Sequence, residues 1–176
     1  MSHSVVLSRA GIGLKAPLVK VEAHLSTGLP AFSVVGLPES SVRESRERVR
    51  SALICSHFKW PDRRITVSLA PAELPKGGGR FDLPIALAIL VASGQLSAGT
   101  VVNREFFGEL GLDGSLRHCR GLLSAVQAAT LDQRAVILPA EQAKKMAVVP
   151  GSRVAAAGDL LSVCGLLKSK SLAVVA

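Results

Sequence analysis

Aromatic residues are scarce in this sequence. Only 3% of its 176 residues are aromatic, with five Phe, one Trp and no Tyr. Proteins that hold single-stranded nucleic acid by its bases stack those bases on exposed aromatic rings. The shortage argues against such a platform, so any nucleic acid that binds is expected to be held through its phosphates, without sequence preference.

Cysteine is also rare. Cys55, Cys119 and Cys164 are odd in number, far apart and outside any C-x-x-C pair. This spacing predicts buried free thiols rather than a disulfide framework or a metal site. His24 has no second His or Cys at ligand spacing, so it is expected on the solvent side of a strand, and no metal is expected in this chain.

Several motifs and segment types are missing. There is no G-x-x-x-x-G-K-[ST] sequence, which excludes nucleotide hydrolysis by a P-loop within this chain, and no G-x-S-x-G nucleophile motif. No signal peptide is visible, and the longest apolar stretch, about twelve residues, is too short to cross a bilayer. These absences predict a cytoplasmic protein with no membrane partner.

Basic residues, in contrast, are in excess. The chain has 21 Lys and Arg against 13 Asp and Glu, which gives a net charge of +8. An excess of this size suggests a polyanion as partner, although it also serves solubility. Hydrophobic residues make up 48% of the chain, enough for one folded domain with a substantial core.

The stretch Ala70–Gly94, APAELPKGGGRFDLPIALAILVASG, organises the chain. Asp82 is predicted to be the N-cap of a helix that ends before Gly94. Because this helix is apolar on every face, it is expected to be the buried central helix of the domain. The turn Lys76–Arg80 presents backbone amides and two cations at the positive helix end, which favours an anion site or an oxyanion hole.

The remaining pattern mixes strands and helices without a strict βαβ repeat, which predicts an α+β fold in two layers with a mixed sheet. Residues 31–36 are expected to pair antiparallel with the alternating strand 17–26, and Asp113-Gly114 to form a two-residue hairpin turn. Further strands are predicted at 64–70, 135–138 and 153–157, and helices at 38–57, 121–130, 140–147 and 159–167. Residues 168–176 lack periodicity and are predicted to begin a linker.

The amphipathic helix 38–57 carries many charges on its outer face. Most of them form i,i+4 pairs of opposite sign, which is typical of a solvated, self-paired surface. Arg46 and Arg50 lie one turn apart with fewer acids beside them. The alternative interpretation is therefore a basic face that contacts nucleic acid or a partner.

Two segments carry a family resemblance. VSLAPAELPKGGGRFDLPIALAIL (67–90) and FGELGLDGSLRHCRGLLSAVQAA (107–129) resemble the Lon-type proteolytic domain, in its amino-terminal, magnesium-chelatase-like variant in the ComM/YifB family of AAA+ ATPases. The resemblance implies a Lon-like fold over residues 1–167, shared with a domain of ribosomal protein S-five. It also implies part of a cytoplasmic hexameric helicase for DNA branch migration in natural transformation, with ATP and Mg bound by a motor domain outside this chain.

The Ser–Lys dyad of Lon-type proteases does not carry over. The nucleophile position falls on Arg80 and the general-base position on Ala125, and no lysine occurs from Val101 to Gln142. Neither an arginine nor an alanine can perform these steps, so the resemblance implies a chain that is not an enzyme. An arginine at this place predicts an anion site, and its removal is expected to cost little stability because helix-end donors repel it.

The resemblance and the basic excess together predict a non-catalytic DNA-binding and assembly domain, monomeric or weakly oligomeric by itself. Alternatives that stay open are a divergent Lon-type peptidase and a magnesium-chelatase-like subunit domain that binds only proteins. The same arginines could instead contact the motor domain or neighbouring subunits. The candidate DNA-binding residues are Lys76, Arg80, Arg117 and Arg120 in one patch, and Arg46 and Arg50 in a second.

Overall fold

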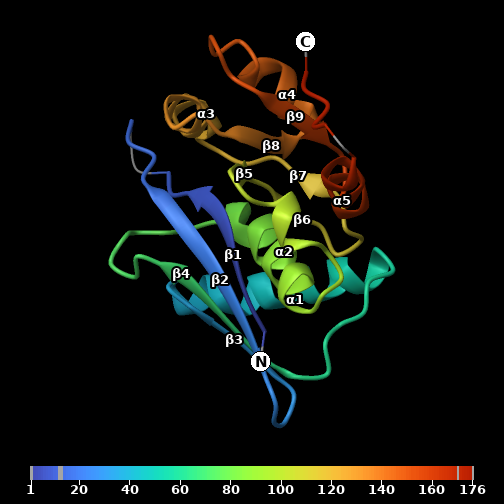
Figure 1. Cartoon of the computed structure of the whole chain (residues 1–176). Helices are drawn as coiled ribbons and strands as arrows, with labels where there is room; N and C mark the ends of the chain where they lie inside the picture. Colours follow the sequence, from blue (N-terminus) through green and yellow to red (C-terminus); the bar gives the residue numbers. More distant parts are fainter. Residues whose placement is uncertain (1, 12–13, 170, 176) are drawn as a thin grey trace.

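A seven-stranded mixed sheet and five α-helices make up the computed structural model, which describes residues 2–11, 14–169 and 171–175 (Figure 1). The strand order is β3-β4-β2-β1-β5-β8-β9, with a separate two-stranded hairpin β6-β7. The strands are β1 (Ser2–Arg9), β2 (Leu18–Ser26), β3 (Ala31–Val35), β4 (Arg64–Ala70), β5 (Arg104–Phe106), β6 (Glu109–Leu110), β7 (Leu116–Arg117), β8 (Ala135–Pro139) and β9 (Val154–Ala157). The helices are α1 (Glu39–Cys55), α2 (Asp82–Ala92), α3 (Leu122–Leu131), α4 (Ala140–Met146) and α5 (Leu160–Lys168). The α+β prediction is confirmed.

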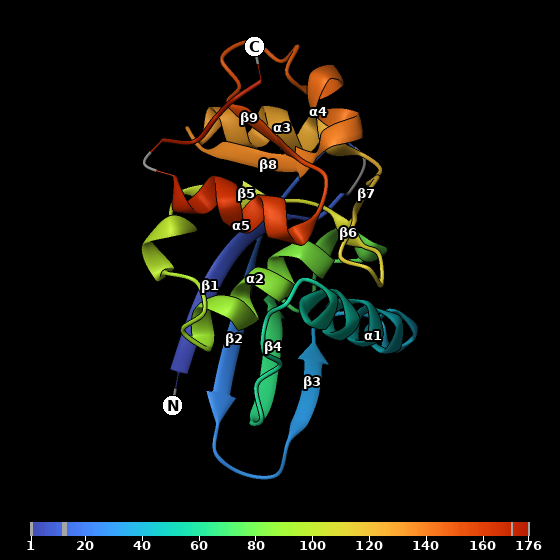
Figure 2. The same ribbon diagram turned by 90° about the vertical axis from the view of Figure 1, so that its right-hand side faces the viewer.

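The predicted pairing of residues 31–36 with 17–26 is wrong. β4 lies between the two strands, antiparallel to β2 and parallel to β3. The connection from β2 to β3 passes around the end of β4 (Figure 2). The reason is α1, which crosses over between β3 and β4 and must bury its apolar stripe on the sheet. Such a crossover makes the strands on either side of the helix parallel.

The central helix α2 is buried as predicted. Ten of its eleven residues are buried, and only Val91 is half-exposed. Its end before Gly94 is also confirmed. The amide of Gln95 donates to the carbonyl oxygen of Leu90 (2.9 Å) while Gly94 adopts a φ of 78°, the left-handed stop that glycine tolerates.

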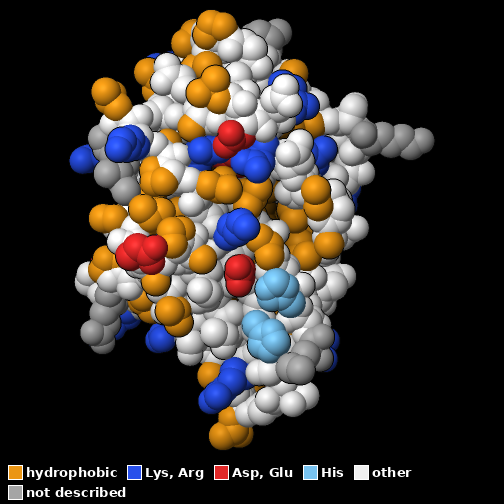
Figure 3. Space-filling model, turned by 60° about the vertical axis from the view of Figure 1, so that its left-hand side comes forward, with side chains coloured by type: hydrophobic (Ala, Val, Ile, Leu, Met, Phe, Trp, Pro, Cys, Tyr) orange, Lys and Arg blue, Asp and Glu red, His pale blue; other side chains and the backbone are white. Residues whose placement is uncertain are grey.

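The two-layer expectation holds for only part of the sheet. Neighbouring residues of β8 enter different cores, with Ile137 against α2 and α5 and Val136 against α3. Since successive strand residues face opposite sides, β8 and β9 are covered on both faces and form three layers. On β1 and β2 the face opposite α2 is open to solvent, and Figure 3 shows histidines there beside basic and acidic side chains.

The hairpin after β6 is present but is longer than predicted. The amide of Gly111 donates to Ser115 O (2.8 Å), so three residues rather than two form the loop. Gly114 takes a φ of 89°, as expected for the left-handed residue that closes a three-residue loop. The cysteine prediction holds for Cys119 and Cys164, which are buried and free, whereas Cys55 is free but exposed.

Residues 168–176 do not run free from the domain where the structure describes them. The amide of Val175 donates to Val154 O in β9 (2.7 Å), and Leu172 packs against the larger core. Positions 170 and 176 of the predicted linker lie outside the described residues. A linker beyond this segment stays a prediction. Within the described residues no helix is long and apolar enough to cross a membrane, and no cluster of metal-ligating side chains is found.

A buried ion-pair network joins β1, β5 and the end of α3. Glu105 has no exposed surface, and its carboxylate accepts from Arg9 Nε (2.7 Å) and from Arg134 Nη1 (3.2 Å). Asp132 lies beside both arginines and also accepts from them. Burial lowers the pKa of Arg9, but its hydrogen bonds and its attraction to Glu105 and Asp132 outweigh this effect and raise it overall. The ion pairs fix these three segments together.

Replacing Arg9 by Met is therefore expected to lower the free energy of unfolding by about 3 kcal/mol, because it leaves a buried carboxylate with only one of its two cations. Urea unfolding followed by circular dichroism measures the change. Lys20→Met, a cation on the exposed face of the neighbouring strand, is the control and should change stability little. An Arg9→Met variant as stable as this control would contradict the role of the network.

Candidate functional site

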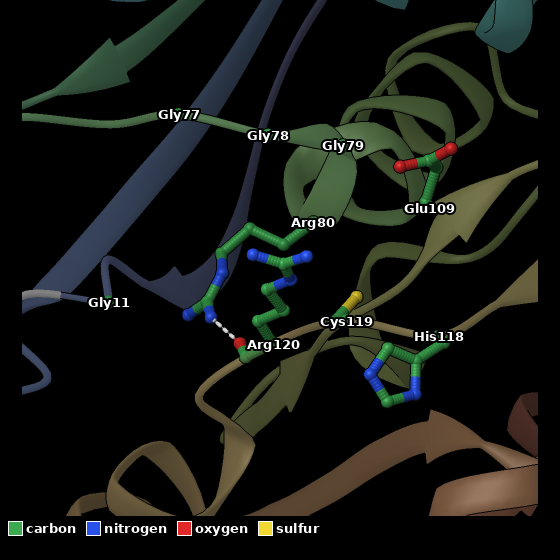
Figure 4. A pocket seen from close by; sticks show the side chains of 9 residues that line it. All are labelled: Gly11, Gly77, Gly78, Gly79, Arg80, Glu109, His118, Cys119 and Arg120. Carbon is green, nitrogen blue, oxygen red and sulfur yellow. Dashed lines mark hydrogen bonds between the residues drawn. The ribbon is translucent and has the colours of Figure 1, made fainter.

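A pocket of about 560 Å³ lies at the amino-terminal end of α2 (Figure 4). It is formed where the glycine turn before α2 meets the end of β1 and the segment that joins β7 to α3. The residues that line it are Gly11, Gly77, Gly78, Gly79, Arg80, Glu109, His118, Cys119 and Arg120. This is the place at which the sequence predicts an anion site.

Arg80 is buried in this pocket, with 9% of its surface exposed. Its Nη1 donates to the carbonyl oxygen of Arg9 (3.1 Å) and its Nη2 to that of Arg120 (Figure 4). Gly11 and Gly121 leave room for the guanidinium, because a Cβ on either would lie 3.0 Å or 3.3 Å from Nη2. Burial lowers the pKa of Arg80, which an attraction to Cys119 opposes.

Arg80 thus connects β1, α2 and the segment before α3. The expectation that its removal costs little stability places the cation beside the repelling donors of the helix end, whereas the structure directs its guanidinium to the carbonyl oxygens of Arg9 and Arg120. Its charge is directed into backbone carbonyls.

Lys76 does not line this pocket. Its side chain has 4% exposure, and its Nζ donates to the carbonyl oxygens of Pro71 (2.5 Å) and Leu74 (2.8 Å). Burial lowers the pKa of Lys76, against the attraction of Glu73. The lysine stabilises the loop that leads into the glycine turn. The sequence predicts Lys76 and Arg80 in one patch, but the two side chains contact different backbone carbonyls and Lys76 does not line the pocket of Arg80.

Arg120 is the exposed cation of the pocket. Figure 4 shows its guanidinium extending toward the glycine turn, beside the stem of Arg80. Arg117 is also exposed, but it lies in β7 opposite Glu109 and does not line the pocket. The carboxylate of Glu109 sits against Gly79, where a Cβ would approach its Oε2 to 2.3 Å. Among the described residues that line it, the pocket therefore combines one cation without an ion pair, Arg120, with one acid, Glu109.

The thiol of Cys119 is unsuited to nucleophilic chemistry. Burial raises its pKa to about 11, so the reactive thiolate is not formed near neutral pH. The His118 ring points to the other side of the strand from the Cys119 sulfur (Figure 4), as expected for neighbours in an extended segment. Ala125, the residue at the general-base position implied by the Lon-type resemblance, is buried in α3.

Asp82 has a different role from the predicted N-cap. Its carboxylate accepts from Ser45 Oγ (2.7 Å), Arg48 Nε (2.6 Å) and the amide of Leu110 (3.1 Å), and no side-chain cap of α2 is formed. Burial raises the pKa of Asp82 to about 6, although these donors oppose the rise. Arg48 is one of the charges of helix 38–57 that the i,i+4 pattern predicts to be solvated, with Glu44 as its partner. The spacing of Ser45 and Arg48, three residues apart on the inner side of α1, was the available signal.

Arg46 and Arg50 lie together on the outer side of α1, and both are exposed. Arg46 Nη1 donates to Phe32 O (3.2 Å), and the guanidinium carbon of Arg50 lies 5.8 Å from the ring centre of Trp60. They line a separate pocket that shares no residue with the one at α2. The structure thus keeps the two predicted groups of cations apart.

Comparison with known proteins defines the class. Residues 21–142 match the family model described as subunit ChlI of Mg-chelatase. Competence protein ComM of Haemophilus influenzae is 48% identical over 170 residues, and YifB of Escherichia coli is 45% identical over 170 residues. Each match covers 97% of this chain. The chain belongs to the ChlI-like family, as the amino-terminal domain of the ComM/YifB proteins. It spans about a third of the length of these curated relatives.

Replacing Arg80 by Ala is expected to lower the free energy of unfolding by about 2 kcal/mol, since two buried carbonyls lose a charged donor. Thermal and urea unfolding measure this, and Arg120→Ala, an exposed cation in the same pocket, is the matched control. Equal stability of the two variants would contradict the connecting role of Arg80.

The pH dependence of stability tests the environment of Asp82. Its pKa of about 6 in the folded chain exceeds the usual 3.8, so the folded state binds more protons between these values. The contribution of Asp82 to the free energy of unfolding therefore falls as the pH rises from about 4 to about 6. Relative to Asp82→Asn, the parent should lose stability across this window and stay constant above it. A relative gain with rising pH would show that the Arg48 pair dominates over burial.

Proposed function

We propose that this chain is the non-catalytic DNA-binding and assembly domain of a ComM-like hexameric AAA+ helicase, which drives DNA branch migration in natural transformation and recombination. The observation that carries the proposal is the 48% identity with a competence protein over 97% of the chain. That protein is about three times as long, which leaves room for a motor domain that binds ATP and Mg. The proposed place of action is the cytoplasm, and the proposed fold over residues 1–167 is Lon-like.

The pocket at α2 supports a non-catalytic role. Arg80 occupies the position of the Lon-type nucleophile, and its donors are directed at backbone carbonyls. Ala125 occupies the position of the general base. Lys76, the lysine nearest in sequence to Arg80, is bound to two carbonyls. Neither the buried Cys119 thiol nor the exposed His118 replaces a Ser–Lys dyad.

The distribution of cations supports DNA binding. Arg46, Arg50, Arg117 and Arg120 are exposed and make no ion pair within the described residues. Exposed arginines bind phosphates without reading sequence. A single domain offers few such contacts, so one copy binds weakly and a ring of copies multiplies the affinity.

Fluorescence anisotropy with labelled duplex and single-stranded DNA, measured over a salt series, tests the proposal. We expect binding at low salt that weakens as salt rises, with no preference among sequences. Neutralising Arg117 and Arg120 together should flatten the salt dependence by up to roughly one phosphate contact per residue. Arg153→Gln, a substitution on a different side of the fold, is the control.

Two outcomes would contradict this function. Absence of DNA binding at low salt, for both the isolated chain and the full-length protein, would favour the magnesium-chelatase-like alternative, in which the domain contacts only proteins. Hydrolysis of unfolded casein, lost on mutation of one serine, would establish a divergent peptidase instead.

A further inference from the structure

The only tryptophan of the chain lies in the loop between α1 and β4, at the far end of the domain from the pocket at α2. Trp60 is half-buried, with its ring centre 5.2 Å from that of Phe32 and tilted by 54°. The preceding residue is fixed by two hydrogen bonds, since the amide of Lys59 donates to Gln95 Oε1 and Gln95 Nε2 donates to Lys59 O (both 2.8 Å). The loop that carries the ring is therefore tied to the end of α2, and the ring itself packs against Phe32.

Pockets flank Trp60 on both sides. One, of about 320 Å³, is lined by Trp60 together with Phe32, Arg46 and Arg50. The other, of about 510 Å³, is lined by Trp60 together with Lys59 and Arg63. Both have Pro61 and Asp62 in their walls. A flat ligand group can thus reach the indole without displacing the core.

The cations around this ring are engaged only by weak contacts, since Arg46 donates one hydrogen bond to Phe32 O and Arg50 lies over the indole. Arg46, Arg50, Lys59 and Arg63 are exposed, and none forms an ion pair with a carboxylate in the part of the chain that the structure describes. They outnumber the two acids of the same pockets, Glu47 and Asp62. The pocket at α2 differs, because Arg80 is directed inward there and the described lining residues hold one acid, Glu109, against one exposed cation, Arg120.

We infer that the surface formed by Arg46, Arg50, Lys59, Trp60 and Arg63, the Trp60 surface, binds single-stranded nucleic acid. A base stacks against Trp60, and the neighbouring phosphates contact the surrounding cations. The inference rests on the proposed function and adds to it a location and a preference for single strands. The amino-acid composition argues against an aromatic platform for bases. In this inference one ring, packed against Phe32 and surrounded by exposed cations, is enough to stack a single base.

The chemistry of the surface selects this ligand over others. An acidic peptide supplies negative charge but no flat face for the indole, and a duplex supplies phosphates but keeps its bases stacked inside. A single strand offers both groups at the spacing of one nucleotide. The guanidinium carbon of Arg50 lies over the Trp60 ring, 5.8 Å from its centre. A base that stacks on this face takes the place of the guanidinium, which then contacts a neighbouring phosphate.

Intrinsic fluorescence reports on this site directly, because Trp60 is the single tryptophan. The isolated chain and the full-length protein are titrated with a short oligothymidylate, with an abasic strand of equal length, and with a blunt duplex. In the full-length protein, any tryptophan outside this chain is first replaced by Phe. We expect quenching by oligothymidylate, with an affinity at least about fivefold higher than for the abasic strand, which has the same phosphates and no bases.

Substitutions separate stacking from charge. Trp60→Leu keeps an apolar side chain against Phe32 and should weaken oligothymidylate binding at least about fivefold by anisotropy, while Trp60→Phe should restore most of it. Arg46→Gln with Arg50→Gln should lower the slope of log affinity against log salt by up to about 0.7 per lost contact. Arg43→Gln, on the exposed face of the same helix, is the matched control. Thermal melts establish that each variant is folded.

The outcomes distinguish this inference from the proposed function. If the parent binds DNA but its fluorescence and the affinity of folded Trp60→Leu are unchanged, the Trp60 surface is not the site and the proposed function stands. If the parent binds neither strand form, both fail. If polyglutamate quenches Trp60 as strongly as oligothymidylate does, the surface is a protein contact and the inference is overturned.

Discussion

Burial of α2 on all sides is the constraint on which the rest of the structure depends. A helix without a solvent-facing side must have its polar ends satisfied by the protein itself. At its start the amide of Leu83 donates to Gly108 O (3.0 Å), and the Asp82 carboxylate binds α1 through Arg48. At its end Gly94 closes the last turn. The two contacts at its start reach segments distant in sequence, so the helix fixes α1 and the segment that leads into β6 relative to each other.

The same constraint decides which cations remain for a ligand. Arg80 and Lys76 stand in sequence where an open helix terminus would attract an anion, yet both are directed into backbone carbonyls near the buried helix. A guanidinium that holds three segments together cannot also follow a mobile phosphate. Exposed cations remain instead on the outer face of α1, on the loop that follows it, and at Arg117 and Arg120 before α3.

Sequence periodicity predicted most elements because their apolar spacing is local. The helix α2, the strand β4 and the Asp159 cap of α5, where Ser162 donates to the carboxylate (2.7 Å), all follow from neighbouring residues. The predictions that were wrong concern features that are set by contacts between segments distant in sequence. The partner of β3 is set by the crossover through α1, and the role of Asp82 is set by an arginine 34 residues away. The composition likewise shows that there is one tryptophan, but its position beside Arg46 and Arg50 of α1 follows only from the fold.

The position of the Trp60 surface has a consequence for how a domain of this kind works in an assembly. The surface is built on α1 and on a loop tied to the end of α2 by the hydrogen bonds between Lys59 and Gln95. Under the proposed function, its few cations would give weak, salt-sensitive binding for one copy, and a strand could then exchange rapidly between copies. Copies linked in a ring raise the effective concentration of the next site without any new contact. Weak sites on rigid domains therefore suit a moving strand better than one tight site, which would hold it in place.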